Sequence, residues 1–297
     1  MPVNRIVTSV LNKTKRRDPW FLDDYTINPY MGCSFNCLYC YIRGSKYGIH
    51  MEQKLVVKEN AVDVLEKQLT NKAKKNQFGI VVLASATEPY LQLEGELKIT
   101  RQFLELLAHY RFPVHVITKS DLVLRDLDLL KKIDANAILP KDLEHHLTNR
   151  AFITFSFSTL DEKISRIFEP GATSPGRRLE TLKAVIDQGI HAGVSLMPLL
   201  PHLTDSQEAI DGYYRTFHQM RVHYLFPASL TLFGSGASDS MSLVFGAIEK
   251  HFPELLTSYR KLYASGFRVD KNYQEELSKR FELARVRFPV PQSILHN

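Results

Sequence analysis

Apolar positions along the chain follow two spacings, one typical of buried strands and the other of amphipathic helices. Residues 79–84 form a continuous apolar run rich in valine, as in a strand that is buried on both faces. Ile99, Phe103 and Leu106 then repeat at the spacing of one helix face, and residues 113–118 have the composition of another strand. The pattern predicts a strand, a helix and a second strand in succession.

The same succession recurs along the chain and predicts six strands with helical stretches between them. Residues 151–158 alternate apolar side chains with small polar ones, including Thr154 and Ser156, so this strand is expected to turn a polar face toward a site. Strands that alternate with helices favour a parallel sheet, and the predicted class is α/β. The six predicted strands cover residues 24–29, 79–84, 113–118, 151–158, 193–200 and 225–233.

Capping residues mark the ends of several predicted helices. Ser174 followed by Pro175 predicts a helix start, because serine is a favoured N-cap and proline fits the first helical turn. Gly189 predicts the end of the same helix. Residues 204–207 resemble a capping box, so the next helix is expected to open there.

All three cysteines of the chain lie within one short stretch, as Cys33, Cys37 and Cys40. A disulfide framework needs an even number of cysteines spread along the chain, so three neighbouring thiols favour a metal centre. Three ligands leave one position of a tetrahedral centre open, which is typical of a reactive site. Ferredoxin-type clusters take four cysteines, and zinc ribbons take paired C-x2-C units, so this C-x3-C-x2-C spacing matches neither.

The C-x3-C-x2-C loop resembles that of the radical SAM superfamily. The resemblance implies that the cysteines bind a 4Fe–4S cluster and that S-adenosylmethionine (SAM) binds its fourth iron. It implies reductive cleavage of SAM to a 5′-deoxyadenosyl radical, which abstracts hydrogen from a substrate. The implied fold is a partial (β/α)6 TIM-like barrel with a C-terminal helical extension. Residues 1–23 are then an N-terminal lead-in, 24–235 the barrel, and 236–297 a helical region packed over its end.

Further motifs resemble the radical SAM branch that contains spore photoproduct lyase, whose members are often described as DNA repair photolyases. They are the sequences at residues 28–41, 86–90, 117–120, 168–179 and 197–205. Spore photoproduct lyase needs an additional cysteine on the loop after the second strand, where this chain has Ser85-Ala86-Thr87. A serine O–H is a far poorer hydrogen-atom donor than a thiol, so thymine-dimer lysis is not predicted.

The resemblance also implies which residues bind SAM. Tyr39 is expected beside the adenine, Thr87 near the methionine end, and Lys119 beside the carboxylate. Ser156 is expected to contact the cofactor, and Met197 to offer backbone to the adenine. The structural alternatives are a solvated lysine at a strand end, a core serine bonded to backbone, and a methionine that fills the core.

No catalytic residue is assigned from the sequence. Tyr41 and Tyr90 are candidate radical relays or packing residues. Glu88 and Asp205 lie on predicted loops after strands, where each either meets the substrate or caps the backbone. Nothing in the spacing of the histidines distinguishes any of them as an acid or base.

Two neighbouring histidines fall in a helix predicted over residues 135–150. His145 and His146 are expected on its surface, because adjacent residues on a helix do not share a face and make poor paired ligands. His50 is considered for a different reason. It is the fourth ligand in the alternative hypothesis, a Cys3His zinc site in a nucleic-acid-binding protein without catalysis.

The charge balance permits an acidic partner. The net charge is +6 and the sequence pI about 9.1. Basic residues are densest at 13–17, which form either a solvated arm or a phosphate-contacting one. The family resemblance implies a nucleic acid or nucleotide as a candidate substrate, and flavodoxin or ferredoxin as the electron donor. Free thiols fit a reducing compartment, and no apolar run approaches the roughly 18 residues of a membrane helix, so a cytoplasmic protein is expected.

Overall fold

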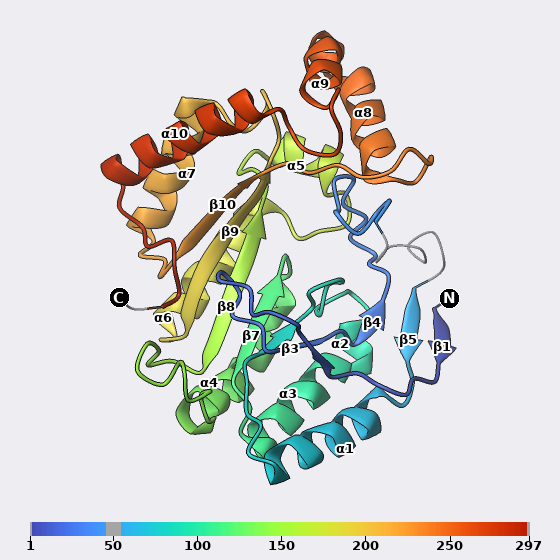
Figure 1. Ribbon diagram of the computed structural model, residues 1–297, viewed down its shortest axis with the longest axis vertical. Coiled ribbons are helices and arrows are strands. Elements are labelled where there is room, and N and C mark those ends of the chain that lie inside the picture. The colour runs from blue at the N-terminus through green and yellow to red at the C-terminus, as the bar shows by residue number, and fades with distance from the viewer. Residues whose placement is uncertain (1, 46–54, 296–297) are drawn as a thin grey trace.

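The computed structural model describes residues 2–45 and 55–295, and a twisted seven-stranded sheet forms its centre (Figure 1). Six of these strands pair in parallel with their neighbours and follow sequence order across the sheet. Each overlaps a strand predicted from the sequence, and the expected α/β partial barrel is confirmed. The six strands are β3 (Tyr25–Ile27), β6 (Val81–Leu83), β7 (Val114–Thr118), β8 (Ala151–Phe157), β9 (His191–Leu199) and β10 (Leu225–Ser229).

Helices connect the parallel strands and bury the apolar stripes that the sequence predicted. Leu65, Phe103, Leu182 and Phe217 are all fully buried. Ser174 caps the expected helix, since its side chain accepts a hydrogen bond from the backbone N–H of Arg177. The helical elements that precede β10 are α1 (Ala61–Lys74), α2 (Glu94–Leu97), α3 (Ile99–Tyr110), the 3-10 segment η1 (Asp121–Asp126), α4 (Leu127–Asn136), α5 (Glu162–Phe168), α6 (Pro175–Asp187) and α7 (Gln207–Gln219).

The helix predicted over residues 135–150 is wrong. The structure ends α4 at Asn136, and the chain then returns to β8 through turns that leave His145 and His146 exposed. Pro140 cannot donate a helical hydrogen bond, which disfavours continuing the helix. The Asp134 carboxylate also accepts hydrogen bonds from the backbone N–H groups of residues 150 and 151, so it holds the returning chain at the start of β8.

The helix predicted to open with a capping box at residues 204–207 begins two residues later than expected. α7 begins after Ser206, whose Oγ accepts a hydrogen bond from the backbone N–H of Ala209 at 3.1 Å. Thr204 Oγ1 instead accepts a bond from the Leu200 backbone N–H at 2.7 Å. Thr204 therefore caps the turn after β9, and the serine caps the helix.

The first residues of the chain contribute strands of their own. β1 (Val3–Arg5) pairs with β5 (Val56–Lys58), which also pairs with β4 (Tyr30–Met31). β2 (Asn12–Lys13) adds an antiparallel edge to β3. The segment that follows crosses the open side of the sheet (Figure 1), where Trp20 stacks on Phe226 of β10 with ring centroids 5.6 Å apart. It therefore bridges the first and last parallel strands.

The C-terminal region packs in two places. α8 (Ser240–His251) and α9 (Leu256–Leu262), joined by the 3-10 segment η2 (Pro253–Leu255), form an apolar cluster with Tyr39 and Phe168. α10 (Lys271–Arg287) lies beside α7, far from these two helices (Figure 1). The backbone N–H of Leu225 also donates to the Pro291 carbonyl, which fixes the C-terminal stretch at the edge strand β10.

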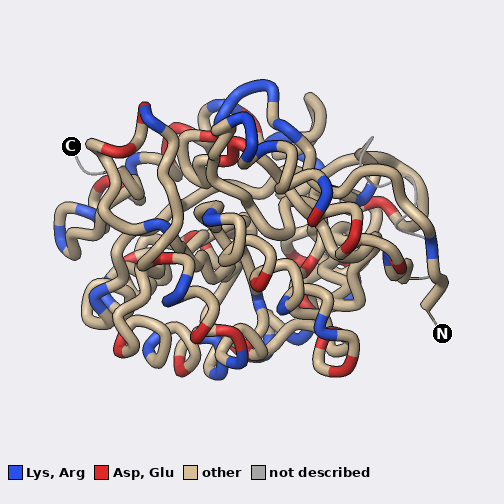
Figure 2. Tube along the Cα trace, turned by 90° about the horizontal axis from the view of Figure 1, so that it is seen from below, with Lys and Arg blue, Asp and Glu red and all other residues tan. Residues whose placement is uncertain are grey.

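The charged residues are distributed around the molecule. Figure 2 shows basic and acidic positions interspersed along most of the trace. Of the basic segment, Lys13, Lys15 and Arg16 are exposed, whereas Arg17 pairs with Asp24 and Asp142. None of the helices in the described ranges is both long and apolar enough to cross a membrane.

Candidate functional site

A cavity of about 550 Å³ opens at the carboxyl ends of the parallel strands. Its walls come from the cysteine loop, from the loops after β6 and β7, and from β8, β9 and β10. The structure brings together every site residue that the sequence predicted. The cavity is lined by Cys33, Cys37, Tyr39, Cys40, Thr87, Lys119, Ser156 and Met197.

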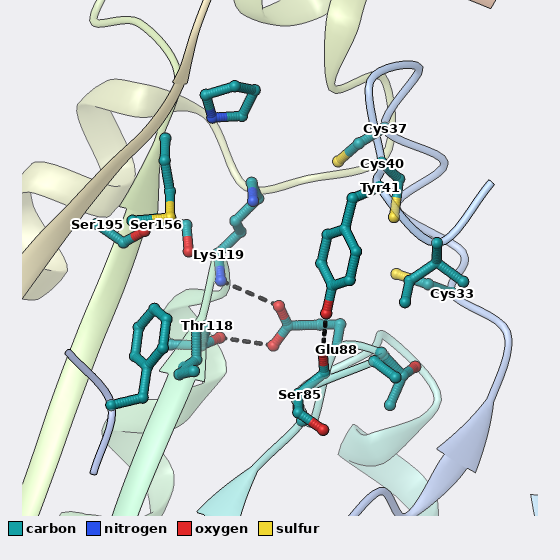
Figure 3. Close-up of a pocket in the computed structure, with 18 of the residues that line it drawn as sticks. Cys33, Cys37, Cys40, Tyr41, Ser85, Glu88, Thr118, Lys119, Ser156 and Ser195 are labelled. Atoms are coloured by element: carbon teal, nitrogen blue, oxygen red, sulfur yellow. Dashed lines mark hydrogen bonds between the residues drawn. The ribbon is translucent and has the colours of Figure 1, made fainter. Parts of the chain in front are cut away.

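The three cysteines occupy one side of this cavity, and Ser156 and Ser195 occupy the other (Figure 3). All three thiols are free and partly buried. The loop that carries them turns tightly, since Gly32 and Asn36 both have positive φ. The Arg43 guanidinium donates to the Cys37 carbonyl at 3.3 Å and to the Ser238 carbonyl at 3.2 Å, so it ties the loop to the C-terminal region.

A second segment, residues 168–171, holds the cysteine loop by its backbone. The Leu38 N–H donates to the Phe168 carbonyl at 2.9 Å, and the Gly171 N–H donates to the Phe35 carbonyl at 2.9 Å. A Cβ added at Gly171 would lie 2.5 Å from the Ser34 carbonyl oxygen, so only glycine fits this approach without a backbone shift.

Buried charge reinforces the same contact. The Tyr39 hydroxyl donates to the Glu169 carboxylate, which also pairs with Arg178 and accepts a bond from Ser158 Oγ at 3.0 Å. Arg178 Nη1 donates to the Ser156 carbonyl at 2.5 Å. Burial alone would raise the pKa of Glu169, but the charges of Arg178 and Lys119 outweigh it, so the pKa lies below its ordinary value. One charged network thus fixes residues on both sides of the cavity.

Lys119 contributes a positive charge to the cavity wall, as an anion-binding site requires. Its Nζ lies 5.9 Å from the centroid of the Tyr39 ring. Burial, and next the charge of Glu88, raise the pKa of Cys33 to about 12, while Lys119 acts in the opposite direction. Burial also raises the pKa of Cys37, and the Lys119 charge again opposes it. The lysine therefore favours negative charge on the cysteines and on any ligand beside them.

Two predicted positions serve local structure as well as lining the cavity. Thr87 Oγ1 donates to the Gly32 carbonyl at 2.5 Å, which joins the loop after β6 to the start of the cysteine loop. Glu88 accepts bonds from Thr118 Oγ1 at 2.6 Å and from the Lys119 backbone N–H at 3.0 Å (Figure 3). Glu88 thus caps backbone, one of the two roles that the sequence left open.

The other candidates divide between the cavity and the core. Tyr41 lines the cavity, and its hydroxyl donates to the Ser85 carbonyl. Tyr90 is buried and does not line it. Asp205 is also buried away from the cavity, where it accepts bonds from the His202 backbone N–H and the Tyr273 hydroxyl.

Sequence reasoning missed several polar residues of the cavity, among them Asp18, Asp23 and Ser195. Ser195 lies directly beside Ser156 in the register of β8 and β9. The polar alternation that marked Ser156 was therefore the available signal for Ser195. No local pattern marks the two aspartates, which reach the cavity only because their segment crosses the sheet.

Zinc and cluster binding make different demands on the cysteine loop. His50, the proposed fourth zinc ligand, lies outside the described residues. Within residues 2–45 and 55–295, no three His, Cys, Asp or Glu side chains are arranged to share one metal ion. A 4Fe–4S cluster binds its cysteines through different irons, so it does not require such a convergence.

Comparison with known proteins identifies the family. The model of the radical SAM superfamily matches residues 27–211, which include the cysteine loop and the four parallel strands β6, β7, β8 and β9. The chain belongs to the radical SAM superfamily. It is accordingly an enzyme of SAM-dependent radical chemistry, as the cysteine spacing predicted.

Relatives of this radical SAM enzyme occur in distant organisms. An uncharacterized protein of Methanocaldococcus jannaschii is 30% identical over 217 residues, covering 68% of this chain and 74% of the relative. An uncharacterized protein of Mycobacterium tuberculosis is 29% identical over 263 residues, covering 86% and 72%. A radical SAM Nalpha-GlyT isomerase of Pseudomonas phage M6 is 21% identical over 187 residues, covering 63% and 35%.

Solved structures of spore photoproduct lyase share the fold. The lyase complexed with dinucleoside spore photoproduct superposes with a TM-score of 0.64 at 16% identity, covering 97% of this chain and 79% of the lyase. A mutant with bound AdoMet and the same photoproduct gives 0.61 at 17% identity, covering 96% and 79%. The expected likeness to spore photoproduct lyase is confirmed at the level of the fold.

Proposed function

We propose that this enzyme binds a 4Fe–4S cluster through Cys33, Cys37 and Cys40 and cleaves SAM in the adjoining cavity. One observation carries the proposal. The three free thiols and the residues expected to hold SAM line the same cavity, at the strand ends where α/β barrels place their ligands. The cavity volume of about 550 Å³ lies within the range of ordinary ligand sites.

The donor set fits the group. Three free, partly buried thiols suit cluster irons, and the Lys119 charge opposes the burial that raises the pKa of Cys33 and Cys37. When bound, the cluster supplies the electron that cleaves SAM to methionine and a 5′-deoxyadenosyl radical, which abstracts hydrogen from the substrate.

The chain's own residues would bind and orient SAM. Lys119 is proposed to attract the SAM carboxylate, and its charge beside Cys37 in the same cavity supports this role. The Tyr39 ring offers a flat apolar wall for the adenine, and its hydroxyl is already taken by Glu169. Ser156 contributes a hydroxyl, Thr87 holds the loop beside the cysteines, and Met197 completes the wall on β9.

The substrate and partners are proposed from the family. A nucleic acid or nucleotide is the proposed substrate, supported by the basic balance of the chain and by the dinucleoside photoproduct bound in the similar lyase. We propose flavodoxin or ferredoxin as the electron donor. Three free thiols support a reducing, cytoplasmic location. Thymine-dimer lysis is not proposed, because the loop at residues 85–87 lacks a cysteine.

Anaerobic reconstitution with iron and sulfide tests the proposal. The protein is expected to show the visible band of the cluster, lose it with dithionite, and release 5′-deoxyadenosine from SAM. Cys37→Ala should lose the band and the product, whereas His145→Ala, a change at an exposed position, should keep both.

The alternative zinc hypothesis predicts a different result from the same preparation. It requires a colourless protein that holds one zinc, never cleaves SAM, and loses its metal in His50→Ala. The cluster proposal requires His50→Ala to retain its iron.

A further inference from the structure

A further part of the cavity wall has a chemistry of its own. It is formed by the segment that crosses the open side of the sheet, residues 17–24, together with the end of β9 and the stretch after β10. This segment contributes Asp18 and Asp23 to the cavity, while the basic residues just before it are exposed outside.

The crossing segment is fixed in place. Arg17 pairs with Asp24 at 2.7 Å and with Asp142 at 2.5 Å. The Phe21 ring packs edge-on against Phe226, with centroids 5.9 Å apart. The Phe21 carbonyl also lies 2.8 Å from Nδ1 of His115, which donates to it. The two aspartates therefore form part of a built wall.

Neither aspartate has a cationic partner among the described residues. One oxygen of Asp18 accepts the backbone N–H groups of residues 20 and 21, at 2.8 and 3.0 Å. One oxygen of Asp23 accepts the Asp18 N–H at 2.7 Å. The second oxygen of each carboxylate makes no hydrogen bond within the described part of the chain. Burial and the charges of Asp18 and Asp24 raise the pKa of Asp23, as expected of carboxylates that lack a counter-ion.

Ser195 gives an independent indication of a ligand. The residue is only 1% exposed and lines the same cavity (Figure 3). Its hydroxyl has no hydrogen-bond partner among the described residues. Because this hydroxyl opens into the cavity, a bound group there can supply the hydrogen-bond partner that the described residues do not. Ser229, the last residue of β10, and Thr231, which follows the strand, add further hydroxyls to this wall.

We propose that Asp18, Asp23 and Ser195 form the substrate subsite of the cavity and bind an amine, guanidinium or similar nitrogen group that carries N–H donors. This inference rests on the proposed function in one respect, which is that SAM binds in the same cavity and the substrate lies beside it. Two unpaired carboxylates repel phosphate and attract a nitrogen cation, and the hydroxyls supply further polar contacts. In a nucleotide or nucleic acid, an amino-bearing base would enter the subsite, and the phosphates would stay outside, toward Lys13, Lys15 and Arg16.

Calorimetric titration with agmatine, which carries a guanidinium and an amine, tests the subsite in near-physiological salt. The reconstituted protein with SAM and no reductant should bind agmatine, and Asp18→Asn combined with Asp23→Asn should weaken binding roughly tenfold. Asparagine keeps the oxygen that accepts the backbone bonds, so the fold is preserved. Ser195→Ala should weaken binding roughly threefold. Asp63→Asn combined with Glu66→Gln, an equal charge change at two exposed positions of α1, should leave it unchanged.

Inorganic phosphate is the opposing probe and should not displace agmatine. The subsite is overturned if agmatine fails to bind, binds the double variant of Asp18 and Asp23 as tightly as the wild type, or is displaced by phosphate. The titration requires no SAM cleavage, so agmatine can bind even if the protein does not cleave SAM. The protein can likewise cleave SAM even if agmatine does not bind.

Discussion

Two buried networks in this enzyme have nearly the same chemistry and different consequences. In the first, Tyr39 donates to Glu169, which pairs with Arg178. In the second, Tyr30 donates to Glu94, which pairs with Arg125 at 2.8 Å. Each places a tyrosine hydroxyl and an arginine on a fully buried carboxylate. The difference lies in what the tyrosine holds.

Tyr39 stands between two cysteines and lines the cavity, and its loop is also held by backbone bonds to residues 168–171, by Arg43 and by Thr87. Tyr30 lies in β4, where its backbone pairs with β5, and it does not line the cavity. The first network is therefore expected to determine loop geometry, and the second only stability. Position relative to the cavity, more than the chemistry of the groups, separates a site network from a structural one.

The largest difference is expected from removing each arginine. Arg178→Met should lower the free energy of unfolding by about 4 kcal/mol, because it leaves a buried carboxylate without its cation. Arg125→Met should cost about 2 kcal/mol. Glu94 keeps the Thr100 backbone N–H at 3.0 Å, and Asp126 keeps Arg101 at 2.9 Å. Urea unfolding of the two apo variants checks the order, and equal losses would contradict the comparison.

A buried contact without a charged partner, between His115 and Thr154, extends the comparison to the effect of pH on stability. His115 Nε2 lies 2.6 Å from Thr154 Oγ1, and burial lowers the pKa of this histidine from 6.5 to about 4. Its unfolded form binds a proton more readily, so stability is full above pH 6.5 and falls as the pH drops toward 4. Between pH 8 and 5, wild type should lose about 2 kcal/mol more than His115→Gln.

Chemical denaturation at the two pH values provides this measurement. Equal losses in the two proteins would show that the pKa of His115 is the same in the folded and unfolded states, which would contradict the prediction. The two proteins differ only at residue 115, so the contributions of all other groups cancel.

The smallest and most specific effects are expected from the tyrosines. Tyr39→Phe and Tyr30→Phe should each cost about 1 kcal/mol, since each removes one hydroxyl donor from a carboxylate with other partners. Only Tyr39→Phe should also lower the iron retained after reconstitution and chelator challenge. Ser158→Ala removes a different donor from the same carboxylate and should retain its iron. Equal iron in all three variants would assign Glu169 a purely structural role.

Local sequence determined much of this protein. Apolar runs and alternating segments predicted all six parallel strands. Side chains in a strand buried on both faces are apolar throughout, and alternation, as at residues 151–158, marks a strand with one polar face. Ser174 and Pro175 marked a helix start through contacts within one turn. The spacing of Cys33, Cys37 and Cys40 indicated the family, since one short loop determines how these thiols are presented.

Only the tertiary structure decided the rest. Tyr39 and Glu169 are 130 residues apart, and Trp20 meets Phe226 across the sheet, so no local periodicity encodes either contact. The aspartates of the crossing segment face the cavity because the order of the strands leaves an open side to cover. Thr204 and Ser206 both had capping chemistry, and the tertiary path of the chain after β9 determined which one caps the helix. Short-range patterns establish elements and motifs, whereas partners distant in sequence are established by packing.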